Sequence, residues 1–348
     1  MKKLFLISLF VCVGILQSLA FDYTDERGVT WGCSEAYNYD TQSYMSAQIN
    51  SASGYGDEVV IPEKVYDGTK EYTVTSIGFT FGENKTLEKV TWPSTVTEIP
   101  YNMFLNCSSL KIVENIKKVT SIGSNAFGDC NNLIALDLGL CGIENQAFYG
   151  CSKLQSIGES AKCTSVGDWA FDGCSSLEKI DLSMCTSVGS WAFHVCSSLR
   201  TVGNPKLTSI PDNAFSNCSS LENIDLSMCT SVGSGAFSGC SSITEVDLSA
   251  CKKLENYAFS CCSSLQTVGN LKLTSIPNDA FEGCSSLENI DLSMCTSVGS
   301  LAFSGCSKLQ NINTSICTYI GNNAFYGCSS ITEVDLSACK EMGGSAFC

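Results

Sequence analysis

Positive charge is scarce in this sequence of 348 residues, which has only two arginines, Arg27 and Arg200, and one histidine, His194. Twenty lysines and arginines stand against 35 aspartates and glutamates, so the formal net charge is −15. A protein that follows a phosphate backbone needs a basic stripe, and an acidic surface repels nucleic acid and anionic lipid. The composition therefore excludes nucleic acid as a partner.

The single histidine also restricts enzymatic chemistry. A Cys-His or Ser-His nucleophilic pair would have to use His194. That residue follows Phe193 at a repeat position where other copies have Ser, Asp, Glu, Gly or Tyr, and such tolerance indicates an outward-facing site. Metal binding would need C-x-x-C pairs or several histidines, whereas the chain offers the adjacent pair Cys261-Cys262. We therefore predict a protein that is not an enzyme, with no metal and no cofactor.

Long hydrophobic runs are absent apart from one at the N-terminus. Lys2-Lys3 precede an apolar run over residues 4–16, which is too short to favour a membrane span. This layout is typical of a secretory signal peptide at residues 1–20, cleaved before Phe21. Removal of that segment leaves 18 basic and 35 acidic side chains, a net charge of −17. The expected localisation is secretion or the cell surface, with no membrane span.

Repetition is the feature that this sequence has in abundance. The pair Ala-Phe recurs every 22 residues in the second half of the chain, and a Cys stands three residues after nearly every Phe. One unit, residues 177–196, reads L-x-x-I-x-L-x-x-C-x-x-V-x-x-x-A-F-x-x-C, the leucine-rich signature in its cysteine form. Such a unit cannot bury its own apolar face, so it must stack on copies of itself. The evenly spaced residues are Phe171, Phe193, Phe215, Phe237, Phe259, Phe281, Phe303, Phe325 and Phe347, with a slipped continuation upstream at Phe148, Phe127, Phe104 and Phe81.

This period predicts an α/β-type solenoid that is mostly β. We expect a right-handed leucine-rich repeat coil with a parallel sheet on its concave side and short strands or 3₁₀ turns on the other side. Residues 177–182 alternate and should form a strand, and Ala192-Phe193 should lie on a helical or 3₁₀ turn. The expected segments are the signal peptide, an N-terminal cap at residues 21–60, and about twelve coils at residues 61–348. The last coil is incomplete, and its uncapped end could support a homo-oligomer.

Most of the 22 cysteines of the mature chain fall into two columns. Eleven follow Phe by three residues: Cys107, Cys130, Cys151, Cys174, Cys196, Cys218, Cys240, Cys262, Cys284, Cys306 and Cys328. Eight occupy the ladder position after the strand: Cys141, Cys163, Cys185, Cys229, Cys251, Cys295, Cys317 and Cys339. Leu207 and Leu273 replace the ladder Cys in two coils, so we interpret the columns as small buried residues with mostly free thiols. Cys33 and Cys348 lie outside the columns and should be the most exposed thiols.

Several motifs resemble the BspA-like family of leucine-rich repeats. They are Val-Thr-Ser-Ile-Gly from Val74, Thr-Ser-Ile-Pro-x-x-Ala-Phe from Thr208 and Thr274, and the recurring Ala-Phe-x-x-Cys-x-x-Leu. The resemblance covers about residues 59–348 and implies a secreted or surface-exposed bacterial protein that adheres to matrix proteins and other cells. It carries no catalytic residues to transfer. Two departures, the Cys at the ladder position and the absence of an anchoring tail after the repeats, leave the mode of attachment to the cell open.

Acidic residues on the strands provide a first candidate binding face. They are Asp137, Asp181, Asp225, Asp247, Asp291 and Asp335, together with Glu178, Glu222, Glu245, Glu288 and Glu333. One interpretation is a solvated face that keeps the long sheet soluble. The alternatives are a concave acidic surface for a basic partner, or weak Ca²⁺ sites where Asp225 and Asp247 fall on successive coils.

Aromatic residues provide a second candidate. Trp169 and Trp191 occupy the same repeat position, two before Phe, on consecutive coils, and Tyr257 occupies it further along. Polar residues at this position in other coils indicate exposure, so we expect the two tryptophans to lie side by side in a contact patch. The alternative is that each ring packs on the edge of its own coil.

These observations favour a non-enzymatic binding protein. The preferred hypothesis is protein–protein or cell-adhesion binding through the acidic concave sheet, with a matrix protein or a glycan as partner. The first alternative is a structural or self-assembling envelope component. The second is an enzyme, against which the single histidine and the absence of clustered metal ligands argue.

Overall fold

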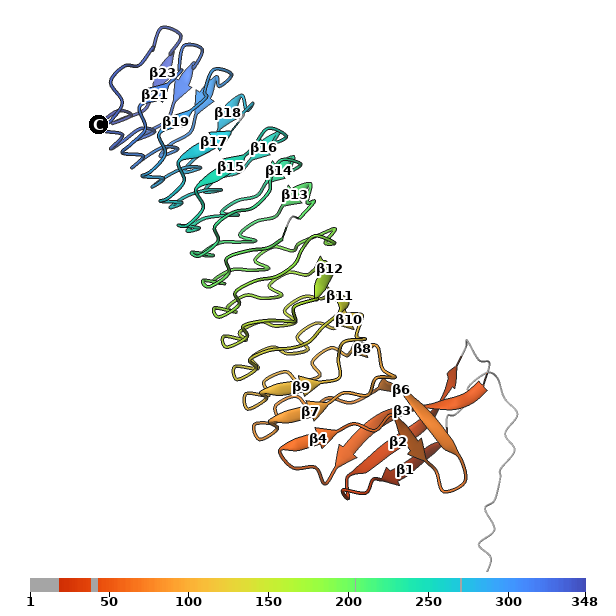
Figure 1. Ribbon diagram of the computed structural model, residues 1–348. Helices are drawn as coiled ribbons and strands as arrows, with labels where there is room; N and C mark the ends of the chain where they lie inside the picture. The colour runs from red at the N-terminus through yellow and green to blue at the C-terminus, as the bar shows by residue number, and fades with distance from the viewer. Residues whose placement is uncertain (1–18, 39–42, 204, 270) are drawn as a thin grey trace, which may run out of the picture.

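The computed structural model describes residues 19–38, 43–203, 205–269 and 271–348, so all but the last two residues of the predicted signal peptide lie outside the described part of the chain. A β-sheet cap at the N-terminal end continues into an elongated stack of coils (Figure 1). The secondary structure of the described residues consists of strands and turns without a helix, so these ranges contain no helix that could cross a membrane. The α/β part of the expected fold class is therefore not confirmed, and the protein is a mostly-β solenoid of stacked parallel strands.

Five strands form the cap, in the spatial order β1-β2-β3-β6-β5. They are β1 (Ala20–Thr24), β2 (Thr30–Asn38), β3 (Ser43–Ser53), β5 (Lys64–Tyr66) and β6 (Glu71–Ile77). The pairs β1–β2, β2–β3 and β5–β6 are antiparallel, whereas β3–β6 is parallel. Trp31 is fully buried at the centre of this unit, and its indole N–H donates to the Asp25 carboxylate over 3.3 Å. The cap thus has its own apolar core.

Two series of very short parallel strands run along the length of the stack. The L-x-x-I segments form β4 (Glu58–Val60), β7 (Lys89–Thr91), β9 (Ile112–Glu114), β15 (Glu245–Asp247), β17 (Thr267–Gly269), β19 (Asn289–Ile290) and β21 (Asn311–Ile312). The Ser-Val and Ser-Ile segments and their equivalents form β8 (Glu98–Ile99), β10 (Ser121–Ile122), β11 (Leu140–Ile143), β12 (Lys162–Val166), β13 (Ser209–Ile210), β14 (Ser231–Val232), β16 (Lys253–Leu254), β18 (Ser275–Ile276), β20 (Ser297–Val298), β22 (Tyr319–Ile320) and β23 (Glu341–Met342). Pairing runs from each coil to the next, as between Val246 and Val268. In the expected strand at 177–182 the pairing shrinks to a single bridge between Lys179 and Thr201.

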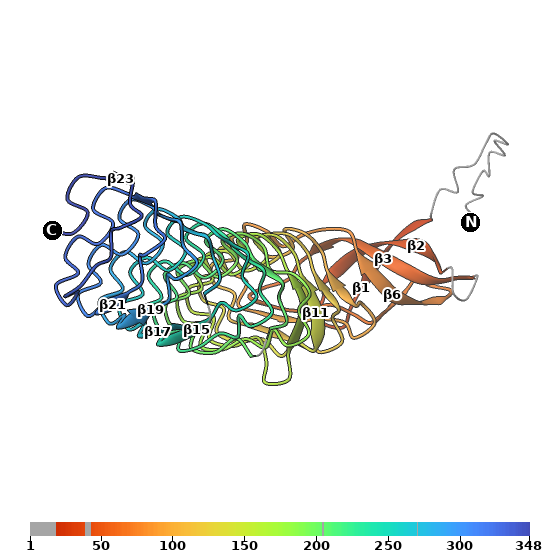
Figure 2. The same ribbon diagram turned by 90° about the horizontal axis from the view of Figure 1, so that it is seen from above.

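A column of phenylalanine rings runs through the core of the stack. From Phe81 to Phe347, successive rings lie nearly parallel in most pairs, with centroids 4.9 to 5.8 Å apart. This spacing is close to the distance between hydrogen-bonded strands, so ring stacking and strand pairing favour the same rise per coil. Figure 2 shows the coils following one another from the cap to the C-terminal end when the stack is seen from above.

Tight turns, rather than the expected helical or 3₁₀ turn, surround each Phe. In one coil the His194 amide donates to the Trp191 carbonyl over 3.2 Å, and the Cys196 amide donates to the Phe193 carbonyl over 3.1 Å. A helix is ruled out here because the residues two before and two after Phe have positive φ, 60° at Trp191 and 57° at Val195. The equivalent positions are left-handed along the whole stack, which explains why Asn and Gly recur there.

Neighbouring coils also approach each other closely at the glycine four residues before Phe. A Cβ added to Gly189 would lie 2.4 Å from the Asp168 nitrogen and the Gly167 carbonyl carbon. No side chain fits that space, because those neighbours are backbone atoms. The recurring Gly therefore reflects close stacking of the coils, in addition to the bend that the sequence suggests.

Candidate binding surfaces

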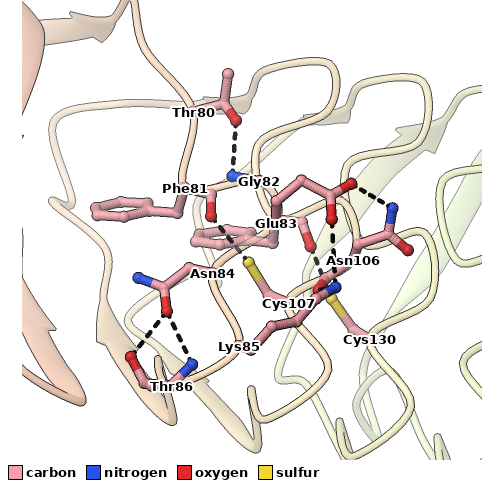
Figure 3. Close-up of polar contacts among 11 residues, drawn as sticks. Thr80, Phe81, Gly82, Glu83, Asn84, Lys85, Thr86, Asn106, Cys107 and Cys130 are labelled. Carbon is pink, nitrogen blue, oxygen red and sulfur yellow. Dashed lines mark hydrogen bonds and ion pairs between the residues drawn. The ribbon is translucent and has the colours of Figure 1, made fainter.

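The cysteines that follow Phe by three residues are hydrogen-bond donors as well as core residues. In Figure 3 the Sγ atoms of Cys107 and Cys130 point at the carbonyl oxygens of Phe81 and Phe104 in the preceding coils, over 3.2 and 3.1 Å. The nine later members of the column make the same contact over 3.0 to 3.2 Å. Each contact needs a protonated, unmodified sulfur, so this column joins coil to coil as a set of free thiols. The sequence interpretation as small apolar residues missed this donor role.

Burial keeps these thiols protonated. It raises the pKa of Cys107 and Cys141 to about 11 and that of Cys295 to about 12. All 22 cysteines within the described ranges are free, and those ranges contain no group of three or more Cys, His, Asp or Glu side chains that could hold a metal ion. The columns therefore belong to the core, and burial disfavours the reactive thiolate form.

One of the two predictions of exposed thiols is wrong. Cys33 is only 2% exposed, because it faces the apolar core of the cap from β2, where its Sγ donates to the Trp31 carbonyl over 3.4 Å. Cys348 is exposed as expected, and so is Cys261, which the sequence did not single out. Cys261 lies two residues after Phe259 at one of the left-handed turn positions, with φ 59°, and these positions point outward. Its place in the repeat was the signal that could have revealed it.

The aspartates of the acidic face have a structural role in the turn that follows the strand. The carboxylates of Asp181, Asp225 and Asp291 each accept the amide N–H of a serine two residues later, over 2.8 to 2.9 Å. Hydrogen bonds from the serine side chain and amide lower the pKa of each of these aspartates. Asp247 and Asp335 make the same turn, whereas Asp137 lies 3.8 Å from Lys117. The recurring Asp-Leu-Ser thus encodes a turn closed by the carboxylate.

The predicted acidic residues form local groups and not one site. Asp225, Glu245 and Asp247 line an open depression of about 600 Å³ on the sheet face, and Asp291 and Glu333 line another of about 450 Å³. The remaining members, Asp137, Asp181, Asp335, Glu178, Glu222 and Glu288, lie along other parts of the stack. The five glutamates are all exposed, as are Asp225, Asp291 and Asp335, but the glutamate carboxylates do not close these turns.

Trp169 and Trp191 lie on adjacent coils, but their rings do not stack on each other. Within the described chain no ring contact joins Trp169 to Trp191; instead, the edge of Trp191 meets the His194 ring at a centroid distance of 4.8 Å. His194 Nδ1 lies 2.8 Å from Asp172 Oδ1 of the preceding coil. We call Trp169, Asp172, Trp191 and His194 the Trp patch. Sequence reasoning found its tryptophans but treated His194 only as a rejected catalytic residue.

Tyr257 lies apart from the Trp patch, three coils further along the stack. Its ring is 47% exposed, and the Asp279 carboxylate of the next coil raises its pKa. Tyr257, Trp169 and Trp191 share the left-handed backbone of their column, with φ of 60°, 52° and 60°. Bulky residues rarely adopt this conformation, which Asn213 and Gly235 adopt at the same position between Trp191 and Tyr257.

Comparison with known proteins identifies the repeat. The profile described as the BspA type leucine rich repeat region matches in six copies over residues 75–200, 139–226, 186–269 and 252–348. No curated protein matches the chain.

Among solved structures, a leucine-rich repeat protein from Bacteroides ovatus is 25% identical, with 89% of this chain and 98% of that chain covered and a TM-score of 0.54. The pneumococcal vaccine antigen PcpA is 16% identical, with 93% and 89% covered and a TM-score of 0.54, which shows a shared fold. A leucine rich cell surface protein from Faecalibacterium prausnitzii is 23% identical, with 93% and 95% covered and a TM-score of 0.46. From its profile match, the chain belongs to the BspA type leucine-rich repeat family.

Proposed function

We propose that this protein is an exported binding protein of the cell surface or medium, which mediates adhesion to another protein or to a cell-surface macromolecule. The family and the sequence of residues 1–20 support this role. We assign the main contact to the Trp patch and a second contact to the exposed glutamates of the sheet face. The protein acts in this proposal without catalysis, metal or cofactor.

The observation that carries the proposal is the conformation of Trp169 and Trp191. A left-handed backbone costs an L-residue about 1–2 kcal/mol, and Asn or Gly largely avoids this cost. Trp169 is also 38% exposed, so a large part of its side chain remains open to a partner. Two large aromatic residues held on adjacent coils against the conformational preference of the position therefore favour a role outside folding. Trp169 is exposed and Trp191 is half-buried, and tryptophan is among the residues most often found at binding hot spots.

The test replaces both tryptophans by the residue that the fold prefers. We expect W169N/W191N to lose little stability in urea, because Asn tolerates positive φ and this offsets the ring burial that is lost. Its binding to immobilised matrix proteins and glycans should fall at least tenfold. Adding N125W/N213W to W169N/W191N moves the two tryptophans to the same position in other coils; this is the matched control and should not restore that binding. Unchanged binding by W169N/W191N, or a large loss of its stability, would contradict the assignment.

The acidic sheet is tested separately by charge removal. E222Q/E245Q/E288Q removes three exposed carboxylates and leaves the aspartate turns intact. If a basic partner contacts this face, the variant should bind that partner more weakly, and added salt should reduce the difference from the wild-type protein. Equal binding of the variant and the wild-type protein at low salt would reject the sheet as a contact surface.

A further inference from the structure

One outward position of each coil forms a continuous edge along the stack. It directly precedes the ladder position, and we call it the edge stripe. Its members are Lys118, Leu140, Lys162, Met184, Lys206, Met228, Ala250, Lys272, Met294, Ile316 and Ala338. Leu140 pairs with Lys162 between strands, and backbone hydrogen bonds connect other coils, such as that from the Thr230 amide to the Thr208 carbonyl over 2.8 Å. These contacts keep successive members in register.

The apolar members of the edge stripe are unusually exposed. Leu140, Met184, Met228, Met294 and Ile316 are 43% to 57% exposed, and they supply five of the large exposed hydrophobic side chains within the described ranges. Single exposed apolar residues are ordinary, whereas a row of them along one edge indicates a contact surface. None of these residues contributes to the Trp patch or to the acidic sheet face.

Charge alternates along the same edge. Lys118, Lys162, Lys206 and Lys272 take part in no ion pair within the described part of the chain. The coils of the last three lysines have Gly158, Gly203 and Gly269 where the coils with an apolar stripe residue mostly have the turn-forming Asp. Coils that have a stripe lysine and no turn-forming Asp therefore lie among coils that have this Asp and no stripe lysine.

We propose that the edge stripe binds a second copy of this chain, antiparallel, about a two-fold axis at Met228. In this register every stripe lysine of one copy meets a coil of the other copy that has the turn-forming Asp; in the Asp247 coil this Asp is accompanied by Lys252 and Lys253. The pairs are Lys118 with the Asp335 coil, Lys162 with the Asp291 coil, Lys206 with the Asp247 coil, Lys272 with the Asp181 coil, Leu140 with Ile316, and Met228 with its own equivalent. A two-fold contact of this kind is self-complementary and closes at two copies.

Matching periods favour a copy of the same chain over an unrelated partner. The charges change from coil to coil at the rise of the solenoid, so a partner that matches them along the edge needs the same rise. A second solenoid has that rise by construction. Ten steps at about 4.8 Å make an edge roughly 50 Å long, which buries about 500–700 Å² on each copy if it is about 10–15 Å wide. This is less than the roughly 800 Å² of a standard interface, so the dimer should be weak and concentration-dependent.

The experiment compares two substitutions in the same local sequence. Met228 and Met294 both lie in the sequence Ser-Ser-Leu-Glu-Asn-Ile-Asp-Leu-Ser-Met-Cys and are 57% and 50% exposed. In the proposed dimer, M228E places two carboxylates opposite each other at the axis, whereas M294E places a carboxylate opposite Lys162. Sedimentation equilibrium of the mature full-length protein at ~0.15 M salt, where the Debye length is about 8 Å, measures association of each form.

We expect the wild-type protein to dimerise at high concentration, M228E to dimerise at least tenfold more weakly, and M294E to dimerise as well as the wild-type protein or better. Equal urea midpoints of the two variants will show that both are folded. A wild-type protein that stays monomeric overturns the proposal. So does a dimer that both variants weaken equally, or one that neither affects, which would instead place the contact elsewhere, as at the last coil. The binding assays of the Trp patch are independent of this result.

Discussion

Replacement of Val195 by Asn should stabilise the protein. Val195 lies two residues after Phe193 with φ 57°, a conformation that is a true outlier for a β-branched residue. Other coils have Asn106, Asn217 or Gly173 at the equivalent position, each with positive φ. The Val195 side chain is 37% exposed, and its amide donates to the Ser216 carbonyl over 2.9 Å, a bond that the substitution preserves.

The expected gain follows from the backbone alone. The left-handed conformation costs about 1–2 kcal/mol per L-residue, and Asn tolerates it better than most side chains. With a small loss of apolar contact subtracted, V195N should raise the free energy of unfolding by about 1 kcal/mol. The reverse change, G305V, should lower it by about 1–2 kcal/mol. Gly305 has φ 77°, and an added Cβ would meet nothing closer than the Gly283 Cα atom at 3.6 Å, so strain and not a clash explains the loss.

Urea unfolding of both variants measures these effects. It should be followed by circular dichroism and by tryptophan fluorescence, because a repeat array can unfold in segments and the two probes then disagree. The same sign of change for both variants, or a V195N variant less stable than the wild-type protein, would refute the role assigned to the turn backbone.

Two further predictions concern the thiols. In the native mature protein, a thiol reagent should react fast with Cys261 and Cys348 and slowly with Cys33. In denaturant without reductant, all 22 thiols should react. The C261S variant should lose one fast-reacting thiol, and fast reaction of most thiols in the native protein would contradict the burial of the columns. Stability should also fall steeply with alkali. Burial raises the pKa of Cys107, Cys141 and Cys328 from 9.0 to about 11, so between these values the unfolded chain loses protons that the native chain keeps, and stability decreases as pH rises. Urea midpoints from pH 7 to 11 check this, and a flat profile above pH 9 would oppose it.

The sequence predicted the repeat, the buried Phe and Cys columns and the exposed acidic face from one physical fact, the fixed interval of 22 residues. It wrongly predicted a helical turn at Ala192-Phe193, because the sign of φ is not visible in a hydrophobic pattern. It also placed Cys33 at the surface, because that residue lies in the cap, where no repeat position indicates which face of the strand is buried. It placed Trp169 and Trp191 side by side without indicating that the ring of Trp191 contacts His194.

Periodicity is a local property, so the sequence by itself determined that this chain stacks into coils and which residues of each coil are buried. Only the tertiary structure decided how one coil acts on the next. The S–H donors of the Cys column, the left-handed tryptophans of the Trp patch and the alternating charges of the edge stripe all depend on contacts or neighbours about 22 residues apart. Their reason is geometric: backbone dihedral angles and the register between coils bring these groups together, and neither is determined by the repeat interval alone.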